Sequence, residues 1–165
     1  MVTETGARLA QSIRRTAEEM RALCAGIDED RASRAPEGRW TPKQILSHLI
    51  GPEPGVMLRL LDLYVQQDVP LLDLHAEQTY PTPERQAMSF AQLVRCFSEG
   101  YEAIARYAEG LTEEQFARTA HVPLLAQSPL GEYPPLAAFI GGLGQYHVQM
   151  HIEHLREILA ATAAK

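Results

Sequence analysis

The chain has 165 residues, of which 45% are hydrophobic and 22% are charged. These values are typical of a folded protein with a sizeable core and exclude a disordered chain, so we expect a single domain over residues 1–165. The formal net charge of -6 argues against a nucleic-acid partner, because binding phosphates requires a basic surface.

Two helices are predicted in the first 65 residues. Apolar residues recur at steps of three and four from Leu9 to Ile27, which predicts the first helix. The second begins at "WTPKQ", where Thr41 and Gln44 are placed for a capping box. The sequence "GPEPG" at 51–55 should kink or interrupt this helix before helical spacing resumes.

A long connection follows at residues 66–88 and contains three prolines. A connection of this length can cross a bundle from end to end, whereas a short one would force antiparallel neighbours. The third helix is predicted to begin after Ser89, which forms a second capping box with Gln92. A short helix is expected at 112–116 and a loop at 119–134.

The fourth helix is predicted to open at Pro134 or Pro135 and contains "GGLG" at 141–144. Each glycine inside a helix costs up to ~1 kcal/mol relative to alanine. Two interpretations stay open, namely close packing against another helix and a substrate entrance beside the helix. No alternating pattern is long enough to predict a sheet, so we expect an all-α four-helix bundle.

The segment "QYHVQMHIEHLREIL" near the C-terminus holds three of the six histidines. His147 and His151 are four residues apart and in register with the apolar stripe, so both should point into the bundle. Two imidazoles at this spacing are neighbours and can bind one metal ion. For His154 three roles stay open: a fourth ligand, a group that supports the ligands, or a partly exposed residue.

His48 on the second helix lies between Ile45 and Leu49, again on an apolar face. A cation would take one nitrogen from each of the three rings, whereas burial without metal requires partners for two nitrogens on every ring. The alternative is three packed, hydrogen-bonded core histidines. His75 and His121 lie in predicted loops and are expected to be solvated.

The segments "WTPKQILSHL" and "HVQMHIEHLREI" resemble those of the DinB/YfiT-like superfamily of metal-binding four-helix bundles. The resemblance implies an up-down-down-up bundle with a long crossover between the second and third helices. It also implies that His48, His147 and His151 are the metal ligands. Trp40 matches a helix-start position in this family and not a ligand.

The resemblance further implies a metal-dependent enzyme that uses a low-molecular-weight thiol, as do the thiol S-transferases and the mycothiol-dependent maleylpyruvate isomerase. An ion held by three neutral imidazoles lowers the pKa of bound water to ~7 and deprotonates a thiol ligand. Three functions stay open: an S-transferase or isomerase, a metal-dependent hydrolase, and a non-catalytic metal-binding protein of a stress response. Zinc, nickel and iron all accept imidazole.

The expected partners are a small-molecule substrate and, through the first helix, a second copy of the chain. No apolar run approaches the ~18 residues that would cross a membrane, and the N-terminus lacks the order of a secretion signal. Cys24 and Cys96 are far apart and form no CxxC motif. A cytoplasmic protein without disulfides is therefore expected.

Overall fold

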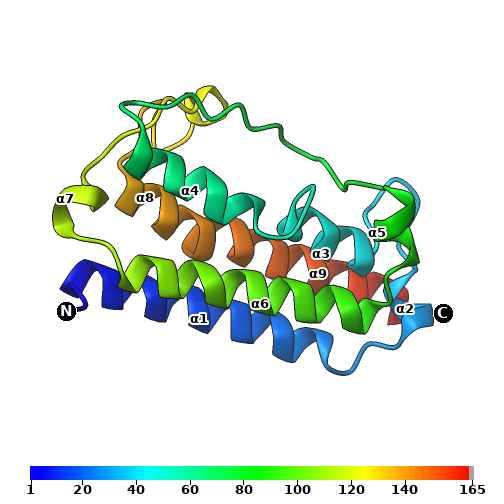
Figure 1. The fold of residues 1–165 in the computed structure, drawn as a ribbon. Coiled ribbons are helices and arrows are strands. Elements are labelled where there is room, and N and C mark those ends of the chain that lie inside the picture. Colours follow the sequence, from blue (N-terminus) through cyan, green and yellow to red (C-terminus); the bar gives the residue numbers. More distant parts are fainter. Residues whose placement is uncertain (164–165) are drawn as a thin grey trace.

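The computed structural model describes residues 1–163, which form helices joined by loops (Figure 1). The long helices are α1 (Glu4–Cys24), α3 (Pro42–Ile50), α4 (Val56–Gln66), α6 (Phe90–Glu109), α8 (Leu136–Gly142) and α9 (Gln149–Ala163), with the π-helical segment η2 (Leu143–Val148) joining the last two. The shorter ones are α2 (Glu29–Ala32), α5 (Pro83–Ala87), α7 (Glu113–Phe116) and the 3-10 turn η1 (Pro123–Leu125). Within residues 1–163 the only extended pairings are two isolated bridges, Leu71 with His121 and Thr119 with Pro135. The expected all-α class is confirmed.

Four helical rods make up the bundle. Figure 1 shows α1 running in one direction, α3–α4 and then α6 in the opposite direction, and α8–η2–α9 returning parallel to α1. The crossover segment, residues 67–82, runs along the outside of the bundle from the end of α4 to α5 (Figure 1). The up-down-down-up order and the long crossover are therefore as predicted.

Local signals set where the helices begin. The capping boxes of Thr41 with Gln44 and of Ser89 with Gln92 are both formed, each with reciprocal side-chain to backbone hydrogen bonds. The second rod is interrupted at residues 51–55, where Gly51 ends α3 with φ of 84°. Glycine adopts this left-handed backbone without the steric cost that a side chain would add.

The apolar faces of the rods meet in one core that includes Ile13, Ile45, Phe97, Ile140 and Ile152. Helix α1 packs against α6 and η2, and α3 packs against α6 and α9. The predicted adjacency of the second and fourth rods is thus present, and it places the histidine-bearing helices side by side.

The glycines of the fourth rod serve helix packing. A Cβ atom on Gly144 would lie 3.4 Å from both Ile13 Cγ1 and Thr16 Oγ1 of α1, and one on Gly141 would lie 3.5 Å from Leu9 Cδ2. The interpretation of "GGLG" as a substrate entrance is therefore wrong, because α1 occupies the space beside it. The close approach coincides with η2, which contains His147 and whose wider turn changes the rotational register of the rod ahead of His151.

None of the helices within residues 1–163 is both long enough and apolar enough to span a bilayer.

Candidate metal centre

Three elements bring three histidines together. His48 comes from α3, His147 from η2 and His151 from α9. One ring nitrogen from each lies within 4.8 Å of the others. The structure thus brings together all three residues predicted as ligands, and the group contains only imidazoles.

His48 and His147 face each other through their Nε2 atoms, which are 2.9 Å apart. The other nitrogen of His48, Nδ1, lies 2.7 Å from the backbone carbonyl of Gln78 in the crossover segment. A carbonyl only accepts, so Nδ1 carries the proton and donates it. The lone pair of His48 is therefore on Nε2, the nitrogen that faces the other two rings.

His151 is only 5% exposed, and neither of its ring nitrogens has a hydrogen-bond partner within residues 1–163. A buried polar group without a partner costs about 1–3 kcal/mol. The ring centroid of His151 lies 4.8 Å from that of His48 and 5.0 Å from that of His147. A cation bound by one nitrogen of each ring would give one of the two unpartnered nitrogens of His151 a partner, so these residues fit a metal ion.

Burial keeps the three rings neutral. It lowers the pKa of His147 to about 4, with a further contribution from neighbouring His48. It lowers the pKa of His151 to about 3, with contributions from His147 and His48, and it also lowers the pKa of His48. Metal ligation requires neutral imidazole, so at pH 7 all three lone pairs are available.

Trp40 covers the histidine group. Its indole stacks on His151 with a centroid distance of 5.9 Å and an interplanar angle of 10°. Its centroid lies 5.1 Å from that of His48 and 5.8 Å from that of His154. From the sequence, Trp40 was predicted only to mark the start of the helix. Trp40 precedes the N-cap Thr41, so helical spacing does not place it on His48, and no sequence signal predicted this contact.

The remaining histidines lie outside the group. Within residues 1–163, the group of ligand atoms close enough to share one ion does not include a nitrogen of His154. His154 is therefore not placed as a fourth ligand. His75 is on an exposed loop, as predicted. His121 is not simply solvated: its Nε2 lies 2.8 Å from Glu132 Oε1, and its ring stacks on Tyr133.

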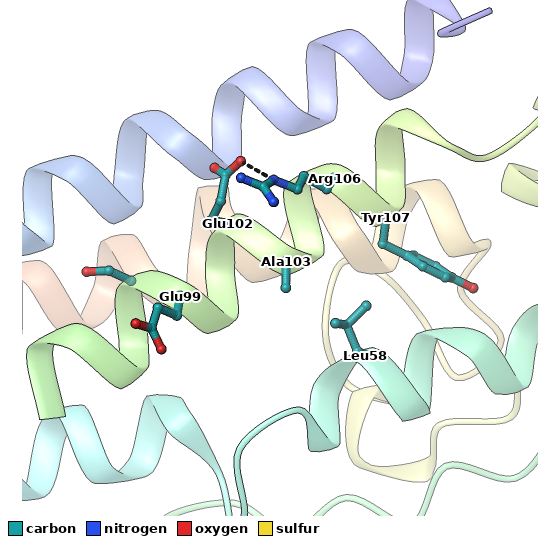
Figure 2. Close-up of a pocket in the computed structure, with 7 residues that line it drawn as sticks. Leu58, Glu99, Glu102, Ala103, Arg106 and Tyr107 are labelled. Carbon is teal, nitrogen blue, oxygen red and sulfur yellow. Dashed lines mark hydrogen bonds and ion pairs between the residues drawn. The ribbon is translucent and has the colours of Figure 1, made fainter. Parts of the chain in front are cut away.

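A surface recess of about 730 Å³ lies elsewhere, between α4 and α6 (Figure 2). Leu58, Ala103 and Tyr107 supply its apolar lining, and Glu102 pairs with Arg106 at its edge. No histidine or cysteine lines this recess. It is therefore separate from the candidate metal centre.

A sequence model of the DinB superfamily matches residues 12–155. The chain belongs to the DinB superfamily. The matched region of this DinB-superfamily protein includes all three clustered histidines. No curated protein matches the chain.

Two solved structures share the fold of this DinB-superfamily protein. YfiT from Bacillus subtilis, described as a probable metal-dependent hydrolase with an unusual four-helix bundle topology, matches with a TM-score of 0.76 and 16% identity over 99% of this chain and 90% of YfiT. An uncharacterized protein from Clostridium difficile 630 matches with a TM-score of 0.69 and 18% identity over 95% of this chain and 96% of that protein. At these identities the likeness shows a shared fold.

Proposed function

We propose that this protein binds one divalent metal ion through His48, His147 and His151 and uses it as an enzyme acting on a small molecule. The observation that carries the proposal is the pair of unpartnered nitrogens on buried His151, set among two other imidazoles. Three neutral lone pairs within 4.8 Å of one another support a single shared ion. Zinc, nickel and iron all suit such a donor set.

The ligand set suggests the kind of chemistry. A divalent ion held by three imidazoles and no carboxylate keeps its charge uncompensated, so it acts as a Lewis acid and lowers the pKa of water or a thiol beside it. His48, His147 and His151 would hold the ion, and the indole of Trp40 would cover the side of the site on which it stacks. Three protein ligands are typical of catalytic sites, since structural sites usually have four.

A low-molecular-weight thiol is the nucleophile that this site favours. The three-histidine group includes no carboxylate that could accept a proton from water. A thiol, with a pKa near 8.5, ionises with far less help than water does. The resulting activity would be an S-transfer or a thiol-dependent isomerisation.

Hydrolysis is the second candidate. The fold is shared with YfiT, which is described as a probable metal-dependent hydrolase. The two candidates differ in whether a thiol is required. A metal-binding protein without turnover would show neither activity.

The experiment that tests the proposal uses cobalt-substituted protein and a panel of cellular thiols. We expect an intense sulfur-to-cobalt absorption band with at least one thiol, and thiol transfer to an electrophile that depends on added metal. Metal-dependent hydrolysis of ester or amide substrates without any thiol response would support the second candidate. Stoichiometric metal binding with neither response would exclude both enzymes.

A further inference from the structure

The crossover segment contacts α3 at the base of the candidate metal centre. Two consecutive carbonyls of this segment accept hydrogen bonds from two consecutive side chains of α3. The Gln78 carbonyl accepts from His48 Nδ1 at 2.7 Å, and the Thr79 carbonyl accepts from the Ser47 hydroxyl. The crossover backbone therefore determines which nitrogen of His48 carries the proton.

The backbone on both sides of these carbonyls is strained. Glu77 has φ of 58° and Tyr80 has φ of 51°, in the left-handed region that favours glycine. Such conformations persist only where the surrounding structure holds them, and they concentrate at functional sites. Something must therefore hold residues 77–80 against α3.

Arg85 on α5 is the side chain placed to do this. It is only 8% exposed. Its Nη1 donates to the backbone oxygen and to the hydroxyl of Ser47, both at 2.9 Å, and its Nη2 donates to the Gly51 carbonyl at 2.8 Å. Carbonyls beyond the last turn of a helix lack intrahelical partners, so the guanidinium also satisfies the carbonyl of Gly51, the C-cap residue of α3. The Ser47 hydroxyl thus joins Arg85 to the Thr79 carbonyl.

We infer that Ser47 and Arg85 are positioning residues that fix the tautomer of His48. By holding residues 77–80 in place, they keep the Gln78 carbonyl on Nδ1 and leave the lone pair on Nε2, toward His147 and His151. Partners of this kind orient metal-ligating histidines and raise their basicity. The consequence for metal affinity rests on the proposed function, whereas the statement about the tautomer does not.

The first test is made on metal-free protein labelled with 15N at histidine. Long-range 1H–15N NMR spectra show which ring nitrogen of His48 is protonated, and we expect Nδ1–H in the wild type. In Ser47→Ala, which removes the link to Thr79, we expect a mixture of both tautomers. Ser98→Ala is the matched control, because within residues 1–163 the Ser98 hydroxyl donates to the Val94 carbonyl of its own helix and to no other group. It should leave His48 unchanged.

The second test measures zinc affinity by competition with a chromophoric chelator. We expect Ser47→Ala and Arg85→Lys to bind zinc about 10–100-fold more weakly than the wild type, the usual effect of removing such a partner. Arg85→Lys keeps the charge but loses the planar fork. If circular dichroism shows that Arg85→Lys does not fold, the zinc affinity of Ser47→Ala alone tests the inference.

The outcomes separate the inference from the proposed function. An Nε2–H tautomer in wild-type His48, or an unchanged tautomer in folded Ser47→Ala, would overturn the inference even if zinc binds. A shifted tautomer in Ser47→Ala together with no zinc binding by the wild type would support the positioning role and overturn the proposed metal site. Weaker zinc binding with an unchanged tautomer would also contradict the inference.

Discussion

Among single residues, His151 provides the strongest evidence for a bound metal ion. It is a neutral imidazole inside an apolar bundle, and neither ring nitrogen has a protein partner in the described chain. Its lowered pKa of about 3 results first from burial. The same burial that frees its lone pair for a cation makes the metal-free protein sensitive to acid.

The pH dependence of metal-free stability follows from this lowered pKa. Above pH 6.5, the ordinary value, His151 is neutral in both the folded and unfolded states. As the pH falls below 6.5, the unfolded state gains a proton that the folded state does not accept until about pH 3. Folding stability should therefore fall between pH 7 and pH 5, by about 2 kcal/mol from this residue.

Urea denaturation of the metal-free protein at pH 7 and pH 5 measures this effect. His151→Leu replaces the titrating ring with an apolar side chain, so its stability should depend less on pH in the same window. An equal pH dependence in the wild type and His151→Leu would contradict a buried, neutral His151.

Trp40 provides a reporter at the same site. It is the only tryptophan in the chain, and its ring centroid lies 5.1 Å from that of His48. Cobalt at the histidine group should therefore quench the fluorescence in proportion to occupancy, with saturation near one equivalent. His151→Ala should lose this response at one equivalent. Quenching that needs a large excess of cobalt in the wild type would place the ion elsewhere.

The three histidines could be predicted because spacing and an apolar face are local signals. His147 and His151 are four residues apart, and His48 follows Ile45 on the buried face of its own helix. The contact with Gln78 could not be predicted, since it uses a backbone carbonyl 30 residues from His48. Every residue has a backbone carbonyl, so the sequence does not indicate which carbonyl will accept this hydrogen bond.

At the level of helices, the starts were predictable and the π-helical segment was not. The capping boxes at Thr41 and Ser89 depend on residues three positions apart, so they are visible in sequence. The glycines at 141–144 indicated an irregularity but left its cause open. The close packing of Gly144 on α1 accompanies the irregularity, and this contact between distant parts of the chain is not encoded in any local pattern.

Gly144→Leu tests this packing role. The added side chain would meet Ile13 and Thr16 of α1, and overpacking of this kind costs about 1–3 kcal/mol. We expect a lower thermal midpoint by calorimetry. Gly100→Ala is the matched control, because nothing lies within 4 Å of a Cβ atom at that position in α6; it should stabilise the helix by up to about 1 kcal/mol. An unchanged midpoint in Gly144→Leu would contradict close packing.

At the scale of the whole molecule, the three-histidine group lies between two rods of the bundle. His48 belongs to the second rod, and His147 and His151 belong to the fourth. An ion bound by all three would link these rods in the folded state only. Metal binding should therefore stabilise the bundle as a whole.

Calorimetry with and without zinc measures this link. Zinc at 100 times its dissociation constant should add about 2.7 kcal/mol, which corresponds to roughly 5–10 °C for a domain of this size. Added chelator should reverse the shift. His147→Ala should show no zinc-dependent shift, and a shift as large as that of the wild type would argue against a shared site.

The homodimer expected through α1 stays a prediction. The exposed face of α1 carries Arg8, Gln11, Arg15 and Arg21, so it offers little apolar area. A pairing through this helix would have to rely largely on polar contacts, and such interfaces are typical of weak association.

The most direct test of the account is the metal content per chain. Protein purified without a nickel column is saturated with zinc, passed through a desalting column and analysed for metals. We expect one ion per chain in the wild type and well below one in each of His48→Ala, His147→Ala and His151→Ala. His75→Ala should keep the wild-type content, because His75 lies outside the group. Full occupancy in the triple variant that lacks His48, His147 and His151 would contradict the account.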